Sequence, residues 1–172
     1  MSRVALVLLS LLLTALLSAC ASLPPSMNDG VTFVLVRHAE KATDDPEDPA
    51  LSEAGRARAQ RLAAQLAQAP VTAIHVTEYR RTAQTAQPTA DAHHVTLTRY
   101  YARGPAAEIA AQWRRDHHRG TVLIVGHSNT IPDLVSALSG QPAPPMSDEE
   151  YGRLTRVHIA PDGAVRVEVS RY

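Results

Sequence analysis

The strongest constraint on the fold is a set of short apolar runs, each of strand length and each separated from the next by a helical pattern. Residues 31–36 and 121–125 (TVLIV) are almost continuously apolar and rich in β-branched side chains. Such runs are typical of strands that are buried on both faces of a parallel sheet, and helices must then cover both faces. We therefore predict an α/β fold, a three-layer α/β/α sandwich with a mostly parallel central sheet.

The remaining elements are predicted from the same periodicities and from start and stop signals. Ser52 can cap a helix that Pro70 ends, and Pro161-Asp162-Gly163 is a turn by its chemistry. The further predicted helices span residues 80–90, 106–118 and 131–138, and the further strands span residues 71–76, 95–98, 154–159 and 164–169. Ser147-Asp148-Glu149-Glu150 has the pattern of a capping box, which predicts a short helix there.

Length and charge restrict the class of function. A chain of 172 residues is long enough for one domain with a real core, and we place this domain at residues 31–172. Lys plus Arg number 17, and Asp plus Glu also number 17, so the chain lacks the strongly basic character of nucleic-acid-binding proteins. No nucleic-acid partner is predicted, and any site for an anion must be local.

The N-terminal segment is predicted to be an export signal that lies outside the domain. Arg3 precedes an apolar run, residues 4–19, that is marginal in length for a membrane span. The run ends in Leu17-Ser18-Ala19-Cys20, which resembles a bacterial lipoprotein signal. The resemblance implies that residues 1–20 are a signal peptide whose processing leaves Cys20 as a lipidated N-terminus. An uncleaved anchor helix is the alternative.

A tether is predicted to join this signal to the domain. Residues 21–30 (ASLPPSMNDG) have no periodicity, as expected of a flexible linker. Cys20 is the only cysteine, so no intramolecular disulfide can form and its thiol is free to take lipid. Either form of the N-terminus anchors the domain to a membrane, outside the cytoplasm. Ala21, where an aspartate would suggest inner-membrane retention, favours the periplasmic face of the outer membrane.

Polar side chains follow three of the predicted strands. Arg37 and His38 follow the first strand, Arg80 and Arg81 follow the second, and Gly126-His127-Ser128-Asn129 follows TVLIV. Ligands of α/β sheets bind beyond the carboxyl ends of the strands. If these strands lie side by side, two imidazoles and at least one guanidinium converge on one crevice, which is a pocket for a dianion. Arginine matches phosphate oxygens, and a neutral histidine nitrogen can attack phosphorus.

These motifs resemble those of the histidine phosphatase superfamily, which has the phosphoglycerate mutase-like fold. Arg37-His38-Ala39-Glu40 is similar to its Arg-His-Gly signature, with alanine in place of the usual glycine, and Gly126-His127-Ser128-Asn129 is similar to its second histidine motif. Residues 51–56 and 77–86 are similar to the segment that opens its first helix and to its phosphate-arginine element. The four motifs occur in the right order between Val31 and about Gly140.

The resemblance implies a phosphatase that works through a phosphohistidine on His38. Arg37, Arg81 and His127 would hold the phosphoryl oxygens, and Ser128 could contact the phosphate or hold its loop. No metal and no cofactor is implied. The substrate would be a phosphorylated small molecule or a phosphorylated component of the cell envelope.

The acid that protonates the leaving group is less well defined. In mutase-like members a carboxylic acid lies a few tens of residues after the phosphate arginine, and Glu108 is the only carboxylate in this stretch, YYARGPAAEIAAQ. Glu108 also suits the first turn of a helix by its charge alone. Ser128 stands where phytase-like members have an aspartate. Three further acids near the mouth are alternatives: Glu40, Asp44 and Asp45.

Two other functions stay open at this point. A phosphate-binding lipoprotein without turnover would be consistent with a missing acid, and a phosphomutase would need more residues for a lid than the chain provides. Without a strong acid, compounds with good leaving groups, such as acyl phosphates, phosphohistidine or aryl phosphates, would be the easier substrates. His93-His94 and His117-His118 are expected to be solvated at the surface, and Trp113 is expected in the core.

Overall fold

The computed structural model describes residues 30–172. The predicted signal peptide, Cys20 and residues 21–29 of the predicted tether lie outside the described residues. Within the described part of the chain, ten elements follow one another: β1 (Val31–Arg37), α2 (Glu53–Leu66), β2 (Val71–Val76), α3 (Arg80–His93), β3 (Leu97–Arg99), α4 (Ala106–Asp116), β4 (Gly120–Gly126), α5 (Ile131–Ser139), β5 (Arg153–Ile159) and β6 (Val165–Arg171).

The strands form one six-stranded sheet in the order β3-β2-β4-β1-β5-β6. β3, β2, β4 and β1 are parallel to one another, whereas β5 pairs antiparallel with β1 and with β6. The antiparallel pair β5 and β6 thus forms one edge of an otherwise parallel sheet. The two apolar runs on which the predicted fold rests, residues 31–36 and 121–125, lie in the central strands β1 and β4. All seven residues of β1 and six of the seven residues of β4 are buried.

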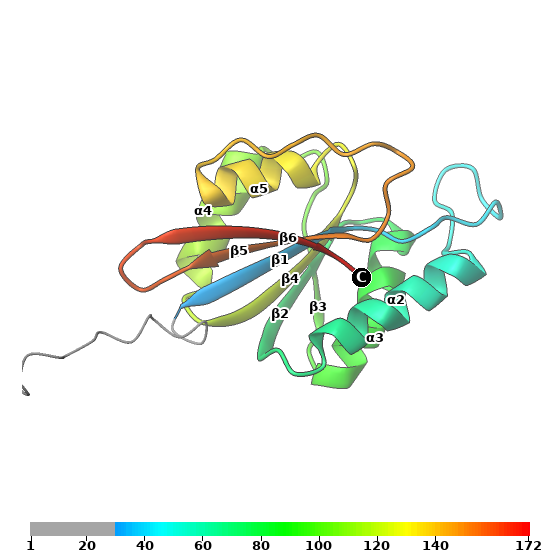
Figure 1. Ribbon diagram of the computed structural model, residues 1–172. Coiled ribbons are helices and arrows are strands. Elements are labelled where there is room, and N and C mark those ends of the chain that lie inside the picture. Colours follow the sequence, from blue (N-terminus) through cyan, green and yellow to red (C-terminus); the bar gives the residue numbers. More distant parts are fainter. Residues whose placement is uncertain (1–29) are drawn as a thin grey trace, which may run out of the picture.

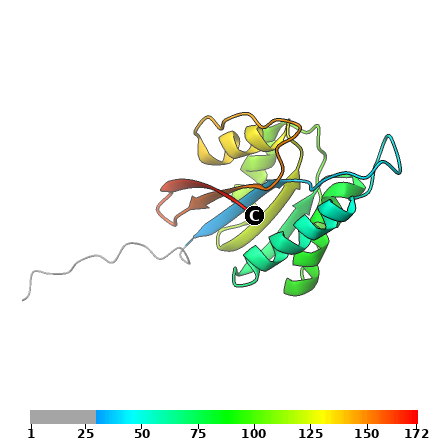
Figure 2. The same cartoon turned by 45° about the vertical axis from the view of Figure 1, so that its right-hand side comes forward.

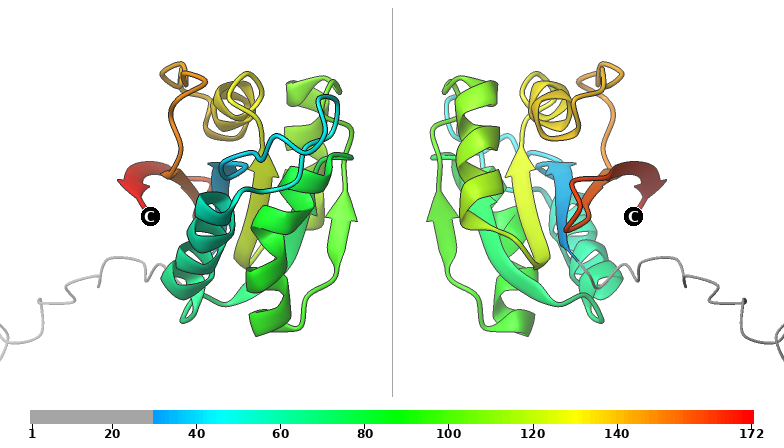
Figure 3. Two further views of the ribbon diagram at one scale, coloured as in Figure 1. Left: turned by 90° about the vertical axis from the view of Figure 1, so that its right-hand side faces the viewer. Right: turned by 90° about the vertical axis from the view of Figure 1, so that its left-hand side faces the viewer.

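Helices cover both faces of this sheet, and the predicted α/β/α sandwich is confirmed. Figure 1 shows α4 and α5 on one face and α2 and α3 on the other, and the end-on views in Figure 3 show the same three layers. Contacts within each helix pair agree with this arrangement. No helix in residues 30–172 is long and apolar enough to cross a membrane.

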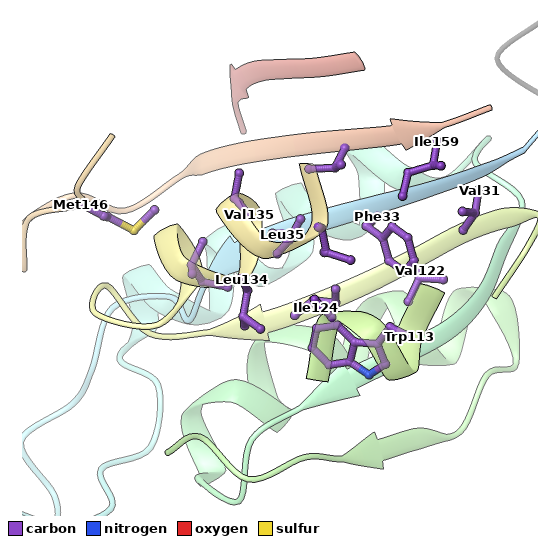
Figure 4. Close-up of a cluster of buried hydrophobic side chains, with 14 residues drawn as sticks. Val31, Phe33, Leu35, Trp113, Val122, Ile124, Leu134, Val135, Met146 and Ile159 are labelled. Carbon is purple, nitrogen blue, oxygen red and sulfur yellow. The ribbon is translucent and has the colours of Figure 1, made fainter. Parts of the chain in front are cut away.

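Each face of the sheet has its own core. On the face of α4 and α5, Phe33 and Ile124 of the sheet pack with Trp113, Leu134 and Val135 (Figure 4). On the other face, strand residues pack against α2 and α3 through another set of buried side chains, which includes Val34, Val36, Leu62, Leu66, Ile74 and Leu123. Trp113 has an exposed fraction of 4%, so its predicted place in the core is confirmed.

The elements differ from the predictions at a few positions. α3 continues through Pro88 to His93, where the prediction ends at residue 90, and β3 is shorter than predicted. The short helix predicted at Ser147-Asp148-Glu149-Glu150 is wrong, because residues 141–152 contain no helix. The backbone carbonyls that this helix would use bind an arginine instead, as described below.

The fold brings three strand ends to the same level. Val125 of β4 is paired with Val36 of β1 on one side and with Val76 of β2 on the other. The residues that follow these three strands therefore leave the sheet side by side. The loop after β1 and the loop between α5 and β5 both extend from this end of the sheet (Figures 1 and 2).

Candidate active site

Two histidines from neighbouring strand ends face each other at this end of the sheet. His38 follows β1 and His127 follows β4, and their ring centroids lie 5.3 Å apart. Both side chains are buried, with exposed fractions of 3% and 8%. They line an open cavity of about 540 Å³, together with thirteen other residues: Arg37, Lys41, Tyr79, Arg81, Ala102, Arg103, Gly104, Ser128, Asn129, Thr130, Asp133, Asp148 and Tyr151.

His38 is held in a form that suits a nucleophile. Its Nδ1 lies 2.8 Å from the carbonyl oxygen of Ala39, and because a carbonyl only accepts, this contact favours the tautomer in which Nδ1 carries the hydrogen. The lone pair is then on Nε2. Burial lowers the pKa of His38 to about 3, and the nearby His127 and arginines act in the same direction. The ring is therefore neutral near pH 7, with a nitrogen that can attack phosphorus.

Hydrogen bonds from two elements fix the backbone around His38. The His38 amide donates to the carbonyl of Gly126 at 2.9 Å, and the next amide, that of Ala39, donates to Thr85 Oγ1 at 2.9 Å. The Thr85 hydroxyl in turn donates to the carbonyl of Arg81 at 2.7 Å. One turn of α3 thus ties the nucleophile loop to Arg81.

The start of α2 packs against the same loop. Ser52 caps the helix by accepting from the amide of Gly55 at 3.1 Å, and its own amide donates to the carbonyl of Glu40. A Cβ atom at Gly55 would lie only 2.2 Å from that Glu40 oxygen. Gln84 of α3 accepts from the amide of Leu51 at 2.7 Å. The motif residues outside the cavity therefore have a structural role, which is to hold the loop between β1 and α2.

Arg37 is buried beneath the loop that leads to β5. Its Nη1 donates to the carbonyl oxygens of Ser147 at 3.2 Å and Asp148 at 2.7 Å, and its guanidinium carbon lies 4.3 Å from the centre of the Tyr151 ring. These contacts hold the loop, which contains no helix, against Arg37. Nε of Arg37 is buried and has no hydrogen-bond partner among residues 30–172.

Arg81 has even fewer partners for its hydrogens. Its guanidinium lies 4.2 Å from the centre of the Tyr79 ring, and Nη1 is 3.6 Å from the nearest oxygen of Asp48. Within the described part of the chain, Nε and Nη1 are both buried without a hydrogen-bond partner. Leaving buried donors unpaired is costly, and an anion in the cavity is the kind of ligand that would satisfy them.

His127 is positioned by a pair of threonines. Its Nε2 lies 3.1 Å from Thr77 Oγ1, which lies 3.0 Å from Thr82 Oγ1. Its amide donates to Thr130 Oγ1 at 3.1 Å. Burial lowers the pKa of His127 to about 4, and the Arg81 guanidinium contributes to this shift. A bound dianion would act in the opposite direction, because a nearby negative charge favours the protonated imidazole.

The structure brings together Arg37, His38, Arg81, His127 and Ser128, but it leaves Glu108 outside the cavity. Glu108 is exposed in the first turn of α4 and does not line the cavity. Ser128 Oγ donates to Asp148 Oδ1 at 2.6 Å.

The three alternative acids also have other partners. Glu40 forms an ion pair with Arg58 at 2.6 Å, Asp44 forms one with Arg80 at 3.2 Å, and Asp45 accepts from backbone amides of its own loop. Of the carboxylates in residues 30–172, only Asp133 and Asp148 line the cavity. The Ser128 hydroxyl and the Arg37 guanidinium lower the pKa of Asp148, which favours the ionised carboxylate, a form with no proton to donate.

Several residues of the site do not appear in the sequence prediction. Thr77 and Thr85 belong to the phosphate-arginine segment, so their closeness to Arg81 in sequence is a signal that could have found them. Asp133 lies four residues after Asn129 of the second histidine motif, so its closeness in sequence is a further signal. Asp148 and Tyr151 lie far from the motifs in sequence, and only the folded chain brings them to the cavity.

No group of three or more metal-ligating side chains occurs within residues 30–172.

His117 is not the solvated residue that its sequence suggests. Its Nε2 lies 3.0 Å from Nε2 of His75, and the His75 ring packs 5.0 Å from Trp113.

Comparison with known proteins gives one match to a family model. Residues 33–102 match the histidine phosphatase superfamily, branch 1. This match supports the histidine phosphatase superfamily. The matched segment contains His38, Thr85 and Arg81, and it ends before β4 and His127. No curated protein sequence matches the chain.

Solved structures share the fold at low sequence identity. The protein histidine phosphatase SixA, solved with tungstate, superimposes with a TM-score of 0.63 at 17% identity, over 81% of this chain and 96% of that one. A phosphoserine phosphatase from Entamoeba histolytica, solved with 3-phosphoglyceric acid, gives 0.61 at 15% identity, over 83% and 98%. A mycobacterial glucosyl-3-phosphoglycerate phosphatase gives 0.57 at 16% identity, over 82% and 97%. These similarities show that the chain has a phosphoglycerate mutase-like fold.

Proposed function

We propose that this chain is a member of the histidine phosphatase superfamily and hydrolyses a phosphorylated compound through a phosphohistidine on His38. The observation that carries the proposal is the set of buried, unpaired guanidinium hydrogens of Arg37 and Arg81 beside a neutral His38. A phosphoryl group would satisfy these donors and place its phosphorus before the nucleophile. The SixA, phosphoserine and glucosyl-3-phosphoglycerate phosphatases that share the fold support phosphatase chemistry in general.

The proposed reaction has two in-line steps. In the first step Nε2 of His38 forms a bond to phosphorus while the bond to the leaving oxygen breaks, and that oxygen takes a proton from solvent, to which the attacking water returns a proton in the second step. In the second step water attacks phosphorus, the nitrogen–phosphorus bond breaks, and inorganic phosphate leaves. Phosphoryl transfer depends mainly on positioning and charge stabilisation, which Arg37, Arg81 and His127 supply in this proposal without a metal ion.

The test is hydrolysis of p-nitrophenyl phosphate with EDTA present, because this ester has a good leaving group and tolerates a weak acid. We expect turnover by the unmodified protein and a loss of roughly 1,000-fold or more in His38→Ala. His118→Ala, which changes an exposed histidine outside the cavity, is the matched control and should keep its activity. Unchanged turnover in His38→Ala would refute the proposal.

A binding protein for phosphorylated ligands is the second candidate. It is favoured by one observation, that Asp148 lies in the cavity but has a lowered pKa. If the protein turned over none of a broad panel of phosphate compounds yet bound inorganic phosphate, this candidate would replace the first. A phosphomutase is the least favoured of the three functions.

We also propose that residues 1–20 are a lipoprotein signal and that a lipid on Cys20 anchors the domain at the periplasmic face of a bacterial membrane, with the outer membrane favoured. The sequence Leu17-Ser18-Ala19-Cys20 is the support for this proposal. Labelled palmitate should enter the protein in a bacterial host and should not enter Cys20→Ser. Equal labelling of the two proteins would contradict it.

A further inference from the structure

A smaller cavity opens beside the one that contains the two histidines. It has a volume of about 270 Å³ and lies between the loop after β3 and the first turns of α4 and α5. Four residues line both cavities: Ala102, Gly104, Thr130 and Asp133. The two spaces are therefore adjacent and share a wall, and we call the smaller one the side cavity.

The side cavity differs in chemistry from the main cavity. Arginines, histidines and a lysine line the main cavity, whereas the walls of the side cavity include Tyr100, Pro105, Ala106, Ile109 and Leu134. Tyr100 keeps its hydrogen, because burial raises the pKa of its phenol well above the usual value. Its hydroxyl donates to the carbonyl of Val125 at 3.4 Å, so the group has a partner within the protein.

Only two polar side chains line the side cavity besides Tyr100, namely Thr130 and Asp133. The Thr130 hydroxyl already accepts from the amide of His127 and contacts the carbonyl of the same residue. Asp133 is the carboxylate at the junction of the two cavities. A molecule that reached from the main cavity into the side cavity would thus pass one carboxylate and then meet side chains that are mostly apolar, beside polar atoms that make up a comparable part of the wall.

We propose that the side cavity binds the leaving group of the substrate and selects phosphoryl compounds whose leaving group is a single aromatic ring or an apolar group of similar size. This inference rests on the proposed function. With the phosphoryl group held by the arginines, the bridging oxygen would lie near the junction, beside Asp133. Cavities of about 150 Å³ lined by apolar residues accept benzene, so 270 Å³ has room for one ring.

Binding of phosphonates tests the inference without any turnover. Phenylphosphonate and methylphosphonate carry the same anionic group and differ in the apolar part, and neither can be hydrolysed. We expect the full-length protein to bind phenylphosphonate at least about tenfold more tightly, since the ring is removed from water. Isothermal titration calorimetry gives both dissociation constants.

Three variants test whether the side cavity causes the preference for the aromatic ligand. Ile109→Phe fills the side cavity and should bring the two affinities within about twofold, while methylphosphonate binds as before. Val165→Phe is the matched control, because Val165 is also a partly buried apolar residue at the same core but lines neither cavity. It should keep the preference for the aromatic ligand. Ile109→Ala, which widens the side cavity, should improve the binding of 1-naphthylphosphonate.

The outcomes separate this inference from the proposed function. Equal affinities for the two phosphonates, or a preference that survives in Ile109→Phe, would overturn the inference even if the protein hydrolyses phosphate esters. A preference that Ile109→Phe abolishes would support it even if no ester is turned over, in which case only the proposed hydrolysis fails. If neither phosphonate binds, the inference is wrong.

Discussion

At the residue scale, the site combines a neutral histidine with two arginines, each of which has at least one buried nitrogen without a hydrogen-bond partner in residues 30–172. His38 is neutral because it is buried, and its tautomer is favoured by one carbonyl. Arg37 and Arg81 cannot lose their charge, and buried hydrogens of both lack acceptors within residues 30–172. Unpaired buried donors are a cost to the folded protein, which a phosphate ligand would offset.

This cost leads to a prediction for Arg81→Met. The variant removes two unpaired buried nitrogens and keeps much of the volume, so its melting temperature without phosphate should equal or exceed that of the unmodified protein. Inorganic phosphate should raise the melting temperature of the unmodified protein but not that of the variant.

Arg80→Met is the matched control for this measurement. Arg80 is the next residue, exposed and paired with Asp44, so its loss should leave the stabilisation by phosphate intact. A phosphate effect of the same size in Arg81→Met would show that Arg81 does not hold the anion.

The two histidines and the arginine beside them could be predicted from the sequence, whereas the acid that protonates the leaving group could not. Arg37 ends β1, and His38 and His127 directly follow β1 and β4, strands that their apolar runs reveal, so the convergence of the three follows from the topology. The prediction of Glu108 rests on its distance along the chain from Arg81, and that distance does not determine the direction of a side chain on α4. Asp133 and Asp148 lie in the cavity only because α5 and the loop before β5 fold over it.

At the scale of elements, α3 links Arg81 to the loop that carries His38. Thr85 accepts from the Ala39 amide and donates to the carbonyl of Arg81, one turn earlier in the helix. Its exposed fraction is 0%, so water cannot replace the hydroxyl. This one side chain therefore links the loop that carries His38 directly to the turn of α3 that carries Arg81.

We expect Thr85→Val to lose roughly 1–2 kcal/mol of stability, because the buried amide of Ala39 is left without its acceptor. The variant should also lose more in kcat than in KM, since the nucleophile moves while the phosphate ligands remain. Thr85→Ser keeps the hydroxyl and should recover most of kcat. Steady-state kinetics and urea unfolding of the three proteins check this prediction, and normal kcat in Thr85→Val would contradict it.

The strands and long helices were predictable from sequence because their signals are local and repeated. Seven buried residues make β1, and Ser52 marks the start of α2. The Ser147 to Glu150 segment shows the limit of such signals. Its capping pattern favours a helix, but Arg37 takes the carbonyl oxygens of Ser147 and Asp148 as acceptors, and this long-range contact has no trace in the local sequence.

At the scale of the whole molecule, the fold buries three histidines in their neutral form. Burial lowers the pKa of His38 to about 3 and those of His75 and His127 to about 4. Unfolded histidines titrate near 6.5. Between these values the unfolded chain binds more protons than the folded protein, so acid favours unfolding.

The free energy of unfolding should therefore fall as the pH is lowered from about 7 to about 4. Each of the three histidines contributes up to roughly 2 kcal/mol of this loss at pH 5. Urea unfolding at pH 7, 6 and 5 measures the effect, and His75→Gln, which lies outside the cavity, should have a shallower dependence. Equal stability at pH 7 and pH 5 would mean that these histidines are not buried in the neutral form.

The central claim is that His38 becomes phosphorylated during turnover. The most direct measurement is to mix the protein with radiolabelled acetyl phosphate and to stop the reaction rapidly without acid. The protein is then digested under alkaline conditions, and the labelled peptide is identified. The account predicts one acid-labile, alkali-stable phosphate on His38, absent from His38→Ala and present in His118→Ala. Turnover without any label on His38, or a label on another residue, would contradict it.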